Sequence, residues 1–256
     1  AHDANSYAPP QRLNLDTTYY WRIDEVNGPP DYTVYKGSVW SFTTEPVAYT
    51  IENVTATASS THNPDMGPEK TINGSGLDAD DLHSKEPLDM WLSGSEPLGA
   101  WIEFQFDKVY KLHEMWIWNS NQVVEPLVGF GFKEVTIEYS TNGVDYATLG
   151  TTVEFAQAPG TAGYAHDTTV NFTGVAAKYV KLTARRNWGG LPQFGLSEVR
   201  FFYIPVSARE PNPASGATDV DVDVVLGFRA GREAAKHDVC FSTNQQAVID
   251  GTAPVT

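Results

Sequence analysis

The chain has 256 residues, of which 32 are acidic and 17 basic, so its formal net charge is -15 at pH 7. That sign repels a phosphate backbone and an anionic lipid surface, which argues against nucleic acid and membranes as partners. The length suits one large domain or two to three small ones. The single cysteine, Cys240, excludes a disulfide framework and a cysteine-based zinc cluster within the chain.

The first 46 residues predict a long hairpin. Two segments rich in aromatic and β-branched residues, 18–23 and 38–43, flank the turn-forming run Asn27-Gly28-Pro29-Pro30. Two strands alone are marginal in water, so this block needs a partner surface. The start at Ala1 lacks an initiator methionine and a signal-peptide pattern, so we expect an internal or mature fragment.

Residues 47–204 hold most of the strand patterns. Apolar and polar residues alternate over 101–106, 135–139 and 180–183, and residues 199–204 are more continuously apolar. Asn142-Gly143 predicts a turn, since both residues tolerate positive φ. Such a series predicts an all-β sandwich with its own core. No apolar run approaches the roughly 18 residues of a membrane helix, so no membrane insertion is expected.

Residues 205–256 begin with a pattern typical of a linker, with prolines at 205, 211 and 213. Alternating Asp and Val over 219–224 then predicts a strand with valine facing a core and aspartate facing water. This block again has too few strands to stand alone.

The two outer blocks resemble complementary pieces of one repeat type. The Tyr-Tyr-Trp-Arg strand and Trp-Ser-Phe-Thr-Thr ending of residues 1–46 resemble the last strands of a fibronectin type III-like domain, and residues 205–256 resemble its first strands. The resemblance implies flanking partial immunoglobulin/fibronectin-like strands. We expect that the two blocks pack together or against a neighbouring chain; frayed ends of truncated repeats are the alternative.

The central block contains a series of short motifs in a fixed order. These are Thr57-Ala58-Ser59-Ser60, Glu69-Lys70-Thr71-Ile72-Asn73-Gly74 with Met90-Trp91, Trp101-Ile102-Glu103-Phe104, and Gly195-Leu196-Ser197-Glu198-Val199-Arg200-Phe201. In this order they resemble the discoidin, or coagulation factor V/VIII C-type, superfamily, and within it carbohydrate-binding module family 32. The resemblance implies a jelly-roll β-sandwich of about eight strands with ligand loops at one end.

The same resemblance implies a structural Ca2+ site, because the family often holds one calcium ion with carboxylate, hydroxyl and backbone oxygens, the ligands of a hard cation. Asn73 stands where the family commonly has Asp, which weakens the site unless a nearby aspartate compensates. The alternative is that this acidic loop is merely solvated. The ligands implied by position are Lys70, Asn73, Ser75, Asp78, Ser197 and Glu198.

Sugar sites combine planar hydrogen-bonding side chains with an aromatic ring for the apolar face of the sugar. Three loops have that mixture: residues 80–85, where the family often has a sugar-contacting histidine, the strand exit after residue 118, and the glycine-flanked turn at 185–194. The residues we expect to bind carbohydrate are His83, Trp118, Asn119, Asn121, Arg185, Arg186, Asn187 and Trp188.

Each of these residues also has a structural interpretation. Trp188 is the strongest candidate because it stands in a turn with two glycines directly after it, whereas Trp118 alternates with another tryptophan as core residues do. Asn119 and Asn121 would hold neighbouring hydroxyls or, alternatively, cap the turn that ends the strand. Of the two adjacent arginines, at most one would reach a ligand.

No catalytic motif is present: His113-Glu114 lacks the second histidine of a zinc protease, and 195–199 lacks the final glycine of a nucleophile elbow. We therefore predict a non-catalytic carbohydrate-binding module. It would attach a larger secreted or surface protein of bacterial type to a glycan or polysaccharide, near a parent catalytic domain. The alternatives are an adhesion or spacer module that binds a protein or cell-surface ligand, and a glycoside-active enzyme with two carboxylates in a cleft.

Overall fold

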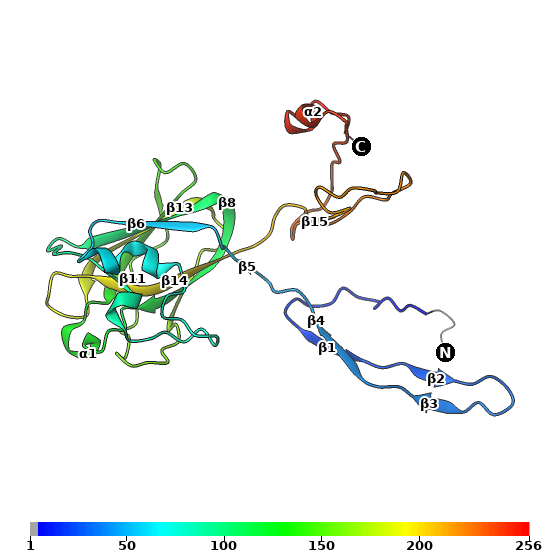
Figure 1. Ribbon diagram of the computed structural model, residues 1–256, viewed down its shortest axis with the longest axis horizontal. Helices are drawn as coiled ribbons and strands as arrows, with labels where there is room; N and C mark the ends of the chain where they lie inside the picture. Colours follow the sequence, from blue (N-terminus) through cyan, green and yellow to red (C-terminus); the bar gives the residue numbers. More distant parts are fainter. Residues whose placement is uncertain (1–4, 256) are drawn as a thin grey trace. The chain divides into compact units, whose positions relative to one another are not determined.

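A computed structural model describes residues 5–255 (Figure 1). The chain divides into two units, of which the first ends at Tyr49 and the second begins at Thr50. The strands are β1 (Thr18–Trp21), β2 (Asp24–Val26), β3 (Val34–Lys36), β4 (Trp40–Thr43), β5 (Tyr49–Thr50), β6 (Val54–Ala58), β7 (Trp91–Leu92), β8 (Ala100–Asn119), β9 (Phe132–Ser140), β10 (Ala147–Thr148), β11 (Val153–Glu154), β12 (Thr168–Asn171), β13 (Ala176–Asn187), β14 (Gly195–Tyr203), β15 (Arg209–Asn212) and β16 (Gly227–Arg229). The helices are η1 (Pro64–Met66), η2 (Pro68–Thr71), η3 (Pro87–Asp89), α1 (Glu125–Val128) and α2 (Gln245–Ile249).

The first unit is the predicted hairpin. β1 pairs antiparallel with β4, which places Trp21 opposite Trp40, and β2 pairs with β3 beyond them. The two indole rings are 4.8 Å apart, yet Trp21 is 48% and Trp40 47% exposed. A two-stranded ribbon cannot enclose a core, so the side chains that would form one lie open. The resemblance of this unit to a fibronectin-like domain stays a prediction.

The second unit contains the predicted sandwich, in which two antiparallel sheets share the 20-residue strand β8. The first half of β8 pairs with β6 and β13, and β13 continues to β9. The second half of β8 pairs with β12 and β14. The fold is all-β, a jelly-roll β-sandwich, and the strand predictions for 101–106, 135–139, 180–183 and 199–204 are confirmed by β8, β9, β13 and β14.

Alternation along these strands fills the space between the sheets. Ile102, Phe104 and Phe106 from the first half of β8 are buried together with Ile117 from its second half and Phe201 from β14. The polar residues between them point outward, as a half-buried strand requires. The predicted turn after β9 is confirmed as well: the chain reverses into β10 and Gly143 has φ 75.

The prediction for residues 219–224 is wrong. The segment has no strand, and Val222 is 96% exposed. The carboxylate of Asp221 accepts a hydrogen bond from the backbone N–H of Asp223, and the N–H of Val224 donates to the Asp221 carbonyl. This local side-chain bonding competes with strand pairing and forms a turn instead.

Among residues 5–255, no helix is long and apolar enough to cross a bilayer. In residues 205–255, the regular elements are the pair β15–β16 and the short helix α2, with an isolated bridge between Cys240 and Val255. The predicted domain limit at 204/205 and the packing of the two outer blocks remain predictions.

Candidate functional site

Several loops meet at one end of the sandwich because the strands that they join pair side by side. Asn187 at the end of β13 lies opposite Phe132 at the start of β9, and a bridge between Gly131 and Gly195 adds the start of β14. The start of β8 lies beside the end of β13, and the end of β6 pairs with β8 on its other side. We call this end the rim and define it by residues 59–63, 93–99, 125–131 and 187–194.

Trp188 is half-buried at the rim, and three polar contacts fix its position. Its indole Nε1–H donates to the carbonyl of Phe155 at 3.1 Å, and its backbone N–H donates to the carbonyl of Gly131 at 3.2 Å. The ammonium of Lys133 lies 4.2 Å from the centroid of its ring. The ring is therefore fixed in place, with a cation over one face.

Asn187 shapes this turn from within. Its amide Nδ2 donates to the carbonyls of Leu191 and Gln193, both at 2.7 Å, and its Oδ1 accepts from the N–H of Gly189 at 3.2 Å. Both amide hydrogens are used. Asn187 therefore shapes the turn that carries Trp188, and the prediction that it binds sugar hydroxyls stays a prediction.

Two residues that the sequence did not single out as site residues lie beside this turn. Gln193 Nε2 and His62 Nδ1 are 3.2 Å apart at the protein surface. The N–H of His62 donates to the carbonyl of Leu92, and that of Glu96 donates to the carbonyl of Pro192, so three rim loops are tied together. Residues 62 and 193 are 131 positions apart, and no local sequence signal links them.

The two adjacent arginines have different environments. Arg186 Nη1 contacts a carboxylate oxygen of Glu134 at 2.7 Å on the outer face of the sheet. Arg185 is exposed, and within residues 5–255 its guanidinium has no polar partner. Of the two, Arg185 is the one free to meet a ligand.

The other predicted sugar contacts are buried, which corrects them. His83, Trp118, Asn119 and Asn121 are each 0% exposed. The Nε1–H of Trp118 donates to the backbone carbonyl of Asp81 at 3.1 Å, and burial lowers the pKa of His83 below its ordinary value, which favours a neutral imidazole. A sugar at the surface cannot reach these groups.

Asn119 and Asn121 instead bind the backbone of neighbouring loops. Asn119 Nδ2 donates to the carbonyls of Phe132 and Ala156 at 2.8 and 2.7 Å. Asn121 Nδ2 donates to the carbonyls of Ser84 and Thr161 at 2.8 and 2.7 Å. Each Oδ1 also accepts a backbone N–H. The two side chains hold loops of distant sequence in place, which is a broader form of the capping alternative.

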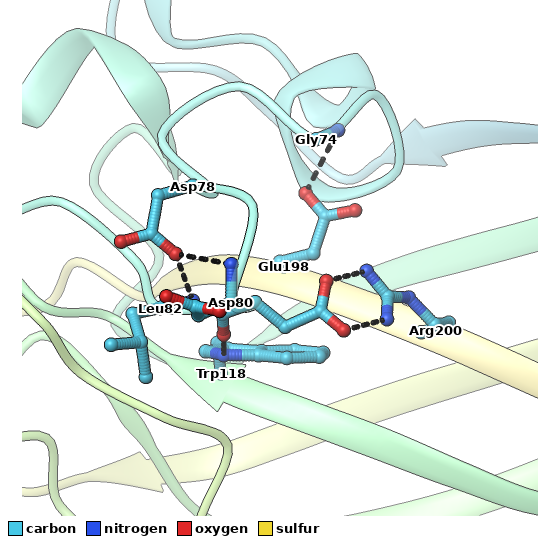
Figure 2. A network of polar contacts seen from close by, with 8 residues as sticks. Gly74, Asp78, Asp80, Leu82, Trp118, Glu198 and Arg200 are labelled. Atoms are coloured by element: carbon cyan, nitrogen blue, oxygen red, sulfur yellow. Dashed lines mark hydrogen bonds and ion pairs between the residues drawn. The ribbon is translucent and has the colours of Figure 1, made fainter.

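A second cluster of oxygens lies beside the loop after η2. The hydroxyl of Ser75 lies 3.2 Å from the carbonyl of Asp89 and 3.5 Å from that of Lys70. Glu198 is only 4% exposed, and its carboxylate accepts one long hydrogen bond, from the N–H of Gly74 at 3.3 Å (Figure 2). Burial raises the pKa of Glu198 to about 8. Carboxylate, hydroxyl and carbonyl oxygens are the ligand types that a hard cation takes.

The structure changes the predicted metal ligands. Asp78 Oδ1 accepts from the N–H groups of Asp80 and Leu82, both at 2.9 Å, in an exposed turn, and Figure 2 shows its carboxylate directed away from Glu198. The hydroxyl of Ser197 is buried and donates to the carbonyl of Asn119, so only its own carbonyl remains available. We therefore remove Asp78 and the Ser197 hydroxyl from the set.

Asn73 and Asp89 complete the description of this loop. Asn73 is exposed, and its Oδ1 accepts from the N–H of Ser75 at 2.8 Å, which shapes the turn and leaves a lone pair on that oxygen. The Asp89 carbonyl, which accepts from the Ser75 hydroxyl, was not predicted, because a backbone oxygen has no residue-type signal in the sequence. Within the described residues, no three His, Cys, Asp or Glu side chains gather as a metal cluster.

The two-sheet topology and the loop-end site define a discoidin-type β-sandwich. The F5/8 type C domain family matches residues 55–198, more than half of the chain, and the chain belongs to this family. No curated protein matches the chain.

Solved structures of Clostridium perfringens modules are similar to this chain. The module CpGH89CBM32-5, in complex with GalNAc-beta-1,3-galactose, is 17% identical with a TM-score of 0.46, covering 60% of this chain and 99% of its own. The family 32 module of NanJ, in complex with galactose, is 17% identical with a TM-score of 0.46, covering 61% and 99%. CBM32-3 of a family 31 glycoside hydrolase is 18% identical with a TM-score of 0.46, covering 61% and 95%.

Proposed function

We propose that the chain is a non-catalytic carbohydrate-binding module whose glycan contact is Trp188 at the rim. The observation that carries the proposal is the half-buried indole itself. It sits in a glycine-flanked turn and is fixed by its own Nε1–H and backbone N–H, without being enclosed in the core. A rigid, partly open ring offers the apolar face of a sugar a surface that requires no ordering on binding.

Polar groups around the ring supply the hydrogen bonds. His62 and Gln193 lie at the surface beside the turn, and Arg185 is exposed at the end of β13. His62 and Gln193 can each donate to or accept from a hydroxyl, and Arg185 can donate to one. Because few atoms of a short glycan are buried and its hydroxyls lose water, we expect a Kd of about 0.1 to 1 mM.

We further propose that a calcium ion supports the loop after η2. Lys70, Asp89 and Ser197 would contribute carbonyls, Asn73 its Oδ1, Ser75 its hydroxyl, and Glu198 its carboxylate. The ion would neutralise a buried carboxylate that otherwise has a single long hydrogen bond. The support for this role is the poor satisfaction of Glu198.

In the full-length protein we propose that the module attaches a catalytic or adhesive partner domain to a glycan or polysaccharide outside the cell or at its surface. Membership of the F5/8 type C family supports a binding role. The alternatives are an adhesion or spacer module for a protein or cell-surface ligand, and a glycoside-active enzyme.

A printed glycan array, read with calcium and again after chelation, separates these functions. Retention on a sugar class supports the proposal, and weaker retention after chelation supports the calcium site. A folded protein that is retained by no glycan would favour the adhesion or spacer function. Release of reducing sugar from a retained polysaccharide would instead establish an enzyme.

A further inference from the structure

Glu125, the first residue of α1, is a buried acid that lies next to the rim. It is 0% exposed, and its two carboxylate oxygens accept from consecutive backbone N–H groups, those of Phe130 at 3.0 Å and Gly131 at 2.9 Å. The backbone carbonyl of Glu125 accepts from the N–H of Gly129 at 2.9 Å and from Gln157 Nε2 at 3.0 Å. One residue thus closes the loop 125–131 through both its side chain and its backbone.

The loop 125–131 is hydrogen-bonded to the turn that contains Trp188. The carbonyl of Gly131 accepts from the N–H of Trp188 at 3.2 Å, and that of Gly129 accepts from the N–H of Gly189 at 2.9 Å. The two backbones approach so closely that a Cβ on Gly189 would overlap the carbonyl of Val128. A shift of the loop therefore moves Trp188 directly.

We propose that Glu125 is the positioning residue of the rim: its ionised carboxylate fixes the loop 125–131 and, through it, the place of Trp188, so that glycan binding strengthens as Glu125 ionises. This inference rests on the proposed function. Glu125 touches no ligand itself, because it has no exposed surface.

The chemistry around the carboxyl group sets the pH at which this happens. Burial raises the pKa of Glu125 to about 7, against the opposing effect of the two N–H groups. The groups that face it are these N–H groups, the Ser120 hydroxyl and the phenol of Tyr164, whose own pKa is raised far above neutrality. Only Glu125 among them titrates near pH 7. Protonation converts one of its two acceptor oxygens into a hydroxyl, which weakens the hold on one N–H.

Hydrogen exchange of the full chain tests the positioning without any glycan. In the wild type, amides in 129–131 and 188–189 should exchange about tenfold faster at pH 6 than at pH 8.5 after correction for intrinsic rates, the factor expected when a hydrogen bond to a charged acceptor is weakened. The variant Glu125→Gln should exchange fast at both pH values. The control Glu103→Gln, which changes a carboxylate bonded to the hydroxyl of Tyr146 on the outer sheet face, should behave as the wild type.

A glycan array read at pH 6 and pH 8.5 then tests the consequence for binding. Retention that falls at pH 6 in the wild type and in Glu103→Gln, and is low and independent of pH in Glu125→Gln, supports the inference. Wild-type exchange without pH dependence, or Glu125→Gln retention equal to wild type, would overturn it. If no protein is retained, the proposed function fails, while hydrogen exchange still decides whether Glu125 positions the loop. If Glu125→Gln does not fold, the wild-type pH series decides alone.

Discussion

Asp81 and Arg200 form a bidentate ion pair, in which Nη1 and Nη2 of the guanidinium each donate to one carboxylate oxygen at 2.7 Å. The guanidinium lies 5.3 Å from the centroid of Trp118, whose Nε1–H donates to the backbone carbonyl of Asp81. Asp81 thereby attaches the loop 77–84 to β14 and β8 by its side chain and its backbone together. The loop lies against the sheet because of residues 119 positions apart.

Replacing Asp81 by Asn should destabilise the protein by about 0.5 to 1.5 kcal/mol at pH 7, a range reduced for the partial exposure of the pair. Asp81 has φ 59, a conformation that Asn tolerates, so the loss reports the charge and not the turn. Arg200 holds the pKa of Asp81 below its usual 3.8. Its stabilisation is therefore present above pH 4 and is lost as pH falls through the lower folded value. Urea unfolding should show the difference between wild type and Asp81→Asn shrinking towards pH 2; a constant difference would contradict this.

The buried amides predict a large cost for two alanine substitutions. Asn119→Ala and Asn121→Ala each remove three hydrogen bonds and leave buried backbone groups without partners, so each should cost about 2 to 4 kcal/mol of unfolding free energy. The control is Asn171→Ala, which loses one exposed bond to the N–H of Thr173 and should cost less than about 1 kcal/mol. Equal costs in urea unfolding would refute the structural role of the buried pair.

Calcium should raise the melting temperature of the chain, because a ligand that binds only the folded state stabilises it in proportion to the logarithm of its concentration. Glu198→Gln should abolish the shift, since it removes the only side-chain charge of the proposed set. Asp78→Asn should keep it, since the Asp78 carboxylate is directed into its own turn. Differential scanning calorimetry with calcium and after chelation provides the measurement. A shift lost in Asp78→Asn and kept in Glu198→Gln would reverse the assignment.

The sandwich could be predicted from the sequence because burial of one strand face leaves a local pattern. The alternation over 101–106 appears directly as the buried Ile102, Phe104 and Phe106. The same reasoning failed at 219–224, where the Asp221 carboxylate accepts from the backbone N–H of Asp223 and the segment forms a turn. An alternating pattern of apolar residues gives a buried strand face only where the segment pairs into a sheet that packs against a core.

The site was predicted only in part, because hydrogen-bond partners leave no local signal. Trp188 could be selected from the two glycines that follow it, whereas the roles of Asn119 and Asn121 depend on carbonyls up to 40 positions away. The contact between His62 and Gln193 spans 131 positions. Whether a polar side chain near a strand end can bind a ligand or instead stabilises the fold depends on such distant partners.

The most direct test of the central claim compares two tryptophans in matched settings. Trp188 and Trp101 are both half-buried, and each has a lysine ammonium over its ring, at 4.2 Å from Lys133 and 4.6 Å from Lys181. Trp101 lies on the outer face of β8, where Lys181 of β13 neighbours it. Loss of glycan binding in one variant alone therefore identifies the contact.

The measurement is the Kd of wild type, Trp188→Ala and Trp101→Ala for a glycan that retains the wild type on the array, with folding checked by circular dichroism. Trp188→Ala should raise the Kd at least about tenfold, the loss expected for an aromatic stacking contact, while Trp101→Ala leaves it within about twofold. An unchanged Kd in a folded Trp188→Ala variant would contradict the account.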